Sequence, residues 1–179
     1  MAHSVELLLD ARSDAAIRSL WGALDKAGLP SQAHVTSPTN RPHITLLAAR
    51  WISPEVDDAL RGLRGRFPLG CVIGAPLVFG GPRQTLARLI VPSGELLDLH
   101  EAIYRRCLPH LTGDPYPHSR PGHWTPHATL GRRLGEAEIG PALAVVNRMA
   151  AGGARDIEAR VTGLRRWDPD ARVDHLLVG

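Results

Sequence analysis

The fold of this chain is decided by two matching stretches, PHITL at residues 42–46 and PHATL at residues 126–130. Each stands at the start of a predicted strand, and each strand is followed by a predicted helix. A related stretch, PHLT at residues 109–112, runs into Gly-Asp-Pro, which is typical of a turn, so we do not expect it to form a strand. One widely spaced copy in each half predicts a duplicated fold, because the units of a solenoid would recur at a shorter period.

The remaining sequence alternates between strand and helix patterns. We expect a helix capped by Ser13 that closes before Gly28, a second with Ser53 as cap and Pro54 in its first position, and further helices at 94–107 and 136–149. Strands are expected at 5–9, 43–49, 69–73, 76–79, 85–91, from 127, at 157–164 and at 173–178. Strands outnumber crossover helices and often follow one another directly. This favours an α+β fold with antiparallel sheets.

The composition is that of a folded, soluble protein. With 179 residues, 44% apolar and 22% charged, the chain is long enough for one domain over residues 1–179. The net charge is only +3, and all but one of the 21 basic residues are arginine. Two explanations account for this excess of arginine over lysine. One is the coding bias of a GC-rich genome, and the other is a preference for guanidinium groups, which can donate two hydrogen bonds to one phosphate. So modest a charge argues against a protein that coats nucleic acid.

The sequence also predicts where the protein acts. Its first residues, MAHSVELLLDARSD, lack the basic front end of a secretory signal, and no later apolar stretch could span a bilayer. Cys71 and Cys107 have neither the spacing of a metal site nor that of a disulfide framework. We therefore expect a reduced, cytoplasmic monomer with no membrane partner.

Strand geometry gives the motif spacing a chemical meaning. Residues i and i+2 of a strand lie on the same face, about 6.6 Å apart along the backbone. His43 and Thr45 therefore share one face of their strand, as do His127 and Thr129. If the two halves face each other, two imidazoles and two hydroxyls converge on one small anion.

This set of side chains suffices for attack on a phosphodiester. A neutral histidine takes a proton from the nucleophile, while a protonated one gives a proton to the leaving oxygen. The ordinary pKa of histidine, near 6.5, lets both forms coexist around neutrality. Threonine hydroxyls can donate to the non-bridging oxygens as charge redistributes. The chemistry requires neither a metal nor a cofactor, and the sequence contains no carboxylate cluster that would hold a metal.

A zinc site is the competing interpretation of the histidines in the second half. The candidate ligands would be His110, His118, His123 and His127. Their spacing matches no familiar zinc pattern, they lack a usable cysteine, and they cross a proline-rich loop. We therefore predict that the protein has no metal site here.

The two motifs resemble the signature of the two-histidine phosphoesterase superfamily, in the branch of bacterial 2'-5' RNA ligases and RNA 2',3'-cyclic phosphodiesterases. The resemblance covers most of the chain. It implies a bilobal fold of two pseudo-symmetric halves, each with a mainly antiparallel sheet and outer helices, with the active-site cleft between them. It also implies hydrolysis of a 2',3'-cyclic phosphate to a 2'-phosphate and, in some members, joining of RNA ends without ATP.

The resemblance also implies roles for the motif residues. His43 resembles the acid that protonates the departing 3' oxygen, and His127 resembles the base that activates water. Thr45 and Thr129 resemble the groups that hold the phosphate. Because the halves are pseudo-symmetric, the acid and base labels could be exchanged. The implied ligand is RNA with a 2',3'-cyclic phosphate end, or a cyclic nucleotide.

Arginines next to the motifs are candidates for binding the substrate. Arg132 sits where many relatives place an arginine near the phosphate, and Arg133 is expected on the same strand face as His127. We expect one of these two to face the cleft. Arg41, just before the first motif, is a similar candidate.

Aromatic residues of the loop before the second motif are candidates for contacting a base or ribose. They are Tyr116, His123 and Trp124. Such side chains stack on unpaired nucleotides, but they also plug loops against the hydrophobic core. The sequence leaves both alternatives open.

Two rival functions remain at this point. The first is an RNA-end binding module that keeps the fold but has no turnover, against which the intact histidines and threonines count. The second is the same chemistry on a different substrate, such as a cyclic phosphate of ADP-ribose. The motifs do not decide between substrates, because the walls of the cleft select the ligand.

Overall fold

The computed structural model of the protein describes residues 2–151 and 156–179. Its helices are α1 (Ala11–Lys26), α2 (Val56–Arg61), α3 (Gly94–Cys107) and α4 (Glu136–Ala151). Its strands are β1 (His3–Leu9), β2 (His43–Ala49), β3 (Leu69–Phe79), β4 (Gln84–Ile90), β5 (His127–Leu134), β6 (Ile157–Asp168) and β7 (Val173–Val178). The described strands pair antiparallel throughout, which confirms the predicted α+β class.

The chain passes twice through the same order of elements, first β1-α1-β2-α2-β3 and then β4-α3-β5-α4-β6. The strands lie in the order β2-β1-β6-β3-β4-β5, and β7 pairs with β6 beside this path. Because β1 corresponds to β4, β2 to β5 and β6 to β3, the order is pseudo-symmetric. We refer to β1, β2, β6 and β7 as the His43 lobe and to β3, β4 and β5 as the His127 lobe. Pairing between β3 and β6 joins the two lobes into one continuous sheet.

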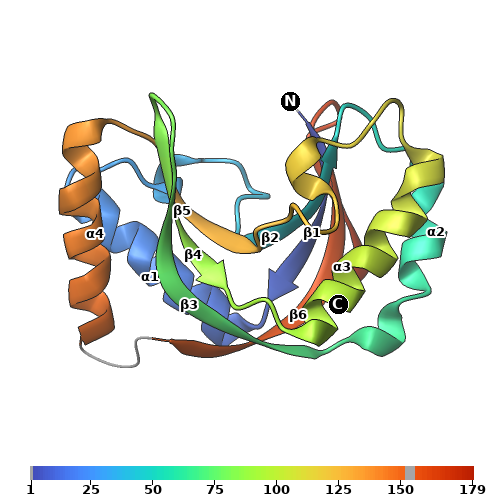
Figure 1. The fold of residues 1–179 in the computed structure, drawn as a ribbon, viewed down its shortest axis with the longest axis horizontal. Helices are drawn as coiled ribbons and strands as arrows, with labels where there is room; N and C mark the ends of the chain where they lie inside the picture. Colours follow the sequence, from blue (N-terminus) through green and yellow to red (C-terminus); the bar gives the residue numbers. More distant parts are fainter. Residues whose placement is uncertain (1, 152–155) are drawn as a thin grey trace.

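The helices form two pairs, one at each end of the curved sheet (Figure 1). Helix α1 packs against α4 and β5, while α3 packs against α2 and β2. The first helix of each repeat therefore supports the motif strand of the other repeat. The two end strands, β2 and β5, also contact each other. This brings together the two strands that begin at His43 and His127.

The apolar residues of the motifs belong to the core, as their alternation predicts. Ile44 and Leu46 of β2 are buried, and so are Ala128 and Leu130 of β5. Burying a large aliphatic side chain contributes about 1.5–3 kcal/mol, so these positions fix which face of each strand points inward. The motif histidines and threonines are left half-buried on the opposite face.

Several predicted element boundaries were wrong. Helix α1 is capped by Asp10, whose carboxylate accepts from the backbone N–H of Ser13 at 3.0 Å, so Ser13 lies inside the first turn. Helix α2 begins at Val56 after Glu55, and neither Ser53 nor Pro54 holds its predicted position. The predicted strands at 69–73 and 76–79 are one strand, β3, with a register shift between them.

Within residues 2–151 and 156–179, none of the helices combines the length and apolar character needed to cross a membrane.

Candidate active site

Each motif histidine is oriented by its own backbone. The Nδ1 atom of His43 lies 2.7 Å from the carbonyl oxygen of Arg41, and that of His127 lies 2.7 Å from the carbonyl oxygen of Thr125. A carbonyl oxygen can only accept, so Nδ1 carries a proton in both rings. The Nε2 atom of each ring is therefore the one available for proton transfer.

A β-bulge follows the threonine of each motif. The pairing register of β2 with β1 skips Leu46, which comes directly after Thr45. The register of β5 with β4 skips Leu130, which comes directly after Thr129. A bulge disrupts the ladder locally and re-aims the side chains that follow it. The duplication therefore extends to the backbone geometry of the two motifs.

Two tryptophans bind the carbonyl groups of the motif threonines. The indole Nε1 of Trp21, on α1, donates to the carbonyl oxygen of Thr129 at 2.9 Å. The indole Nε1 of Trp124 donates to the carbonyl oxygen of Thr45, also at 2.9 Å. Each tryptophan comes from the repeat that does not carry the motif it binds. These hydrogen bonds join the two halves of the chain at the backbone of the candidate catalytic threonines.

The ring of Trp124 is stacked on His100, with 4.0 Å between the ring centroids and 8° between the planes. The Nε2 of His100 lies 3.1 Å from the carbonyl oxygen of Leu46 and 3.0 Å from that of Ser119. Burial lowers the pKa of His100, although these two carbonyls oppose the shift. Since one face of Trp124 is covered and its N–H is engaged, these contacts favour the plugging role over base stacking. No sequence pattern indicates the part played by His100.

His127 stands in surroundings that favour its neutral form. The ring of Phe79 lies 4.6 Å from its ring, centroid to centroid. Burial lowers the pKa of His127, and the positive charges of Arg132, His43 and His118 lower it further.

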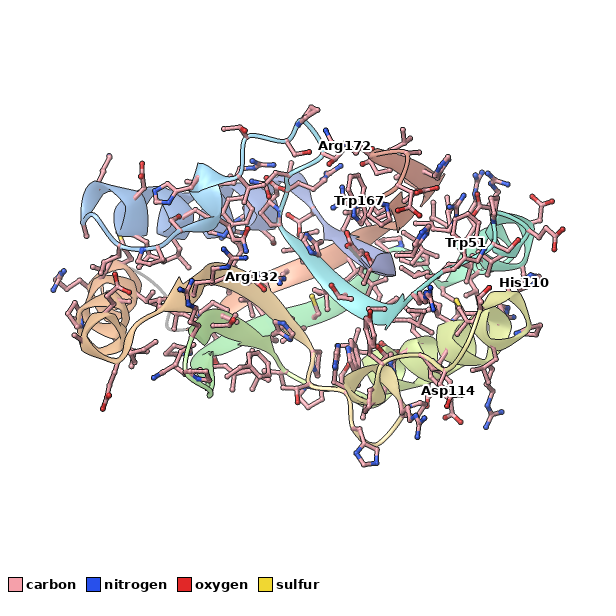
Figure 2. The ribbon with its side chains drawn as sticks, turned by 90° about the horizontal axis from the view of Figure 1, so that it is seen from above. Trp51, His110, Asp114, Arg132, Trp167 and Arg172 are labelled. Carbon is pink, nitrogen blue, oxygen red and sulfur yellow. The ribbon has the colours of Figure 1, made fainter. Side chains whose placement is uncertain are left out.

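Arg132, not Arg133, shares a strand face with the second motif. The bulge at Leu130 shifts the alternation by one residue, so that Arg132 pairs with Thr85 while Thr129 pairs with Ala87. The prediction that Arg133 lies on the face of His127 was therefore wrong. Arg133 adopts a left-handed backbone conformation with φ 64°, and both arginines are exposed. Figure 2 shows Arg132 projecting from β5.

The other predicted contact residues lie around the two motifs. Arg41 is half-buried and holds His43 through its carbonyl group. Tyr116 is 39% exposed and stacks on His118, with 6.0 Å between the ring centroids. His123 is exposed. His110, from the third motif copy, ends a short 3-10 helix and does not start a strand, as predicted.

A buried carboxylate beside the first motif is absent from the sequence prediction. Oε1 of Glu6 lies 3.7 Å from Nε2 of His43, and its other oxygen is bound by Arg165. The one sequence signal for it was a charged residue inside the otherwise apolar strand at 5–9. A single sequence does not reveal which side of the sheet such a residue faces or which partner it meets.

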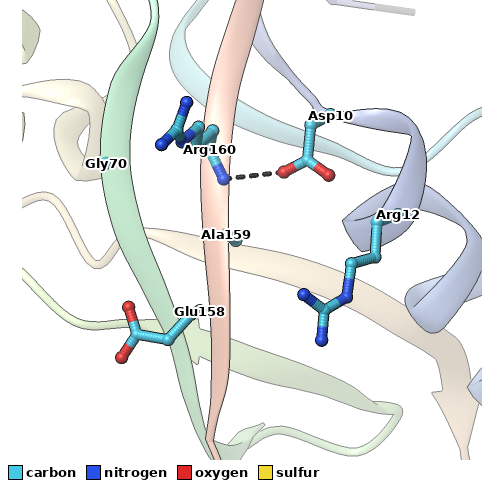
Figure 3. Close-up of a pocket in the computed structure, with 6 residues that line it drawn as sticks. All are labelled: Asp10, Arg12, Gly70, Glu158, Ala159 and Arg160. Atoms are coloured by element: carbon cyan, nitrogen blue, oxygen red, sulfur yellow. Dashed lines mark hydrogen bonds between the residues drawn. The ribbon is translucent and has the colours of Figure 1, made fainter.

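Side chains that could bind a metal ion lie together at another place in the structure. In the part of the chain that the structure describes, the group able to offer three ligands is His3, Asp168 and Asp170. It includes none of the histidines of the zinc interpretation. A pocket of about 460 Å³ also lies outside the motifs (Figure 3). Its lining residues are Asp10, Arg12, Gly70, Glu158, Ala159 and Arg160.

A known family covers nearly the whole chain. The model of the 2'-5' RNA ligase superfamily matches residues 9–172. The chain belongs to the 2'-5' RNA ligase superfamily. The match includes both histidine motifs, and it confirms the family resemblance that the motifs carry. No curated protein has a significant sequence match to this member of the superfamily.

Solved structures share the fold of this superfamily member. E. coli LigT complexed with 3'-AMP is 17% identical, with a TM-score of 0.54 over 99% of this chain and 94% of LigT. TT0787 of Thermus thermophilus is 18% identical, with a TM-score of 0.54 over 99% and 95% of the two chains. Usb1 of Kluyveromyces marxianus with uridine monophosphate is 13% identical, with a TM-score of 0.51 over 99% and 98%. At these identities the likeness shows the fold alone.

Proposed function

We propose that this protein, acting as one bilobal domain, hydrolyses RNA-type 2',3'-cyclic phosphates to 2'-phosphates, with His43 and His127 as its acid and base. One observation carries the proposal: both rings donate Nδ1–H to the carbonyl two residues earlier and keep Nε2 for proton transfer. The strands that begin with these rings, β2 and β5, contact each other, and a positive charge on His43 lowers the pKa of His127. A pair of positioned imidazoles is what general acid–base cleavage of a phosphodiester requires.

The reaction follows from these atoms. The neutral histidine takes a proton from a water molecule while the oxygen of that water attacks phosphorus. The bond from phosphorus to the 3' oxygen breaks. The protonated histidine gives its proton to that oxygen, which leaves a 3' hydroxyl and a 2'-phosphate. The hydroxyls of Thr45 and Thr129 donate to the non-bridging oxygens, where negative charge grows in the transition state. Arg132, on the same face as the second motif, adds a positive charge close to the phosphate.

The nature of the substrate is supported by the solved relatives. LigT was solved with 3'-AMP and Usb1 with uridine monophosphate, which are both nucleotides. We accordingly assign this protein a nucleotide or an RNA end as ligand. Joining of RNA ends belongs to the same proposal, because a 5' hydroxyl can take the place of water. The neutral histidine then takes the proton of that hydroxyl as its oxygen bonds to phosphorus, and the bond from phosphorus to the 3' oxygen breaks as before, which leaves a 2'-5' phosphodiester and a 3' hydroxyl.

Phosphorus NMR tests the proposal directly. The protein is incubated with 2',3'-cyclic AMP, an oligonucleotide with a cyclic phosphate end and ADP-ribose cyclic phosphate, in the presence of EDTA. We expect conversion of a cyclic RNA phosphate to its 2'-phosphate. Shifted signals without product would instead favour a binding module, and exclusive turnover of the ADP-ribose compound would change the substrate class.

Single variants then test the histidines. We expect His43→Ala and His127→Ala each to lower turnover by about 10²–10⁴, the usual effect of a positioned acid or base. His110→Ala is the matched control, because His110 has the same preceding proline and following threonine but ends a 3-10 helix. Near-normal rates in both motif variants would refute the mechanism.

A further inference from the structure

The pseudo-symmetric sheet places different residues beside the two motifs. Opposite the motif threonine, the neighbouring strand presents Glu6 in the His43 lobe and Ala87 in the His127 lobe. The next strand repeats the contrast, because Arg165 pairs with Glu6 whereas Leu77 pairs with Ala87. The backbone is duplicated, but an ion pair in one lobe corresponds to two apolar residues in the other. The two histidines therefore meet different electrostatic environments.

The carboxylate of Glu6 is fixed on all sides. Ser4 Oγ donates to its Oε1 at 2.6 Å, and Arg165 donates to its Oε2 through Nε at 2.8 Å and Nη2 at 2.7 Å. Arg165 is itself held by the carbonyl oxygen of Thr39 at 2.9 Å and by Asp174 at 3.0 Å. Glu6 is only 5% exposed, so solvent does not screen its charge. Such a carboxylate cannot swing away to another partner.

The distance from this carboxylate to the first motif is informative. Oε1 of Glu6 and Nε2 of His43 are 3.7 Å apart, which exceeds a hydrogen bond but lies within the range where opposite charges stabilise each other. Although burial raises the pKa of Glu6, the charges of His43 and Arg165 outweigh this and lower it. Glu6 is therefore ionised at neutral pH. A fixed negative charge at this distance stabilises a positive charge on the His43 ring without occupying its Nε2.

We propose that Glu6 is a positioning residue that keeps His43 as the protonated member of the histidine pair, with Arg165 fixing its carboxylate. The inference rests on the proposed function, and it assigns the role of acid to one histidine and the role of base to the other. His43 delivers its proton to the departing 3' oxygen, and His127, which stands against Phe79, accepts a proton from water.

The surrounding charges reinforce this division of roles. Arg132 and His118 act on His127 and favour its neutral form. The carboxylate of Asp174 is paired with Arg165. Among the described residues, Glu6 is the one whose carboxylate makes an ion-pair contact with His43.

The pH dependence of kcat/KM tests the proposal in the full-length protein. In Glu6→Gln, the loss of activity at high pH should begin at lower pH by about one unit, because His43 gives up its proton more easily. The rise at low pH, which reports His127, should not move. Asp174→Asn is the matched control: it removes the other carboxylate from Arg165 but leaves Glu6, so neither limb should shift. A Glu6→Gln profile that keeps both limbs in place would overturn the proposal.

NMR titration of the histidine ring protons provides a second readout that needs no turnover. In the unmodified protein, His43 should remain protonated to higher pH than His127, and the opposite order would overturn the proposal even if Glu6→Gln fails to fold. In folded Glu6→Gln, the titration midpoint of His43 should fall. If the titrations agree but no cyclic phosphate is hydrolysed, the proposed function fails while the influence of Glu6 on His43 stands.

Discussion

The indole N–H of Trp21 donates a 2.9 Å hydrogen bond to the carbonyl oxygen of Thr129, which lies in the other half of the chain. Trp21 is 4% exposed, so an unpaired polar group at this contact would be poorly solvated. The bond reaches the backbone directly before the bulge at Leu130. A residue of helix α1 thus fixes the strand that carries His127.

We expect Trp21→Phe to lower the free energy of unfolding by about 1–3 kcal/mol, because the indole donor is lost and ring volume is removed from the core. We also expect kcat to fall, since the position of Thr129 is less well defined. Urea denaturation and steady-state kinetics measure the two effects. Trp51→Phe is the control, since Trp51 is 39% exposed. Equal behaviour of the two variants would contradict a special role for Trp21.

The second prediction concerns the acid side of the pH profile. Because burial, and then the charge of Arg132, lowers the pKa of His127 below its ordinary 6.5, the neutral form of His127 persists at pH values below 6.5. Arg132→Gln should raise the pKa of His127 and move the low-pH limb of kcat/KM upward by a few tenths of a unit, roughly what an exposed and screened charge supplies.

Arg133→Gln is the matched control for this experiment. It removes the same charge from the adjacent residue, which the bulge displaces from the face of His127. Its low-pH limb should stay where it is in the unmodified protein. A larger shift in Arg133→Gln than in Arg132→Gln would show that Arg133, and not Arg132, lies on the strand face of His127.

The third prediction concerns the close approach of two backbones at Gly131. A Cβ atom placed there would overlap the carbonyl oxygen of Pro30, a backbone atom that cannot rotate away. Gly131→Ala should therefore push the segment at Pro30 off β5 and lower stability by about 1–3 kcal/mol, as overpacking does. Thermal unfolding of Gly70→Ala serves as reference, because nothing lies within 4 Å of a Cβ at Gly70. Similar melting temperatures for both variants would argue against the contact.

The fourth prediction concerns Asp10, which links α1 to β6. Its carboxylate accepts from the backbone N–H of Ser13 at 3.0 Å and from that of Arg160 at 2.7 Å. Asp10→Ala should lower the free energy of unfolding at pH 7 by about 1–2 kcal/mol, the usual effect of losing an N-cap. Asp14→Ala, which removes an ion pair with the partly exposed Arg18, should cost about 0.5 kcal/mol or less.

The contribution of Asp10 should also depend on pH. Although burial raises the pKa of Asp10, the hydrogen bonds from Ser13 and Arg160 outweigh this and hold it below the ordinary 3.8. A depressed pKa in the folded state stabilises the protein above pH 3.8, and this stability is lost as the pH falls through the folded value. The difference between the unmodified protein and Asp10→Ala should therefore shrink on acidification. A difference that grows toward low pH would be inconsistent with this assignment.

The sequence by itself determined the two motifs, their strands and the side chains that face together within each strand. His43 and Thr45, like His127 and Thr129, are two positions apart, and a period of two is a local property of an extended backbone. The buried partners Ile44 and Ala128 follow from the same alternation. The repeated order of strands and helices could be predicted for the same reason, because the pattern that indicates each element lies in consecutive residues.

Only the tertiary structure decided what lies beside each motif. The bulge at Leu130 moved Arg132 onto the strand face of the second motif in place of Arg133, and an unpaired residue in a ladder leaves no mark in the hydrophobic pattern. Glu6 met His43 and Arg165 because strands distant in sequence pair side by side. Cross-strand neighbours are set by register, which depends on the packing of the whole sheet and not on local sequence.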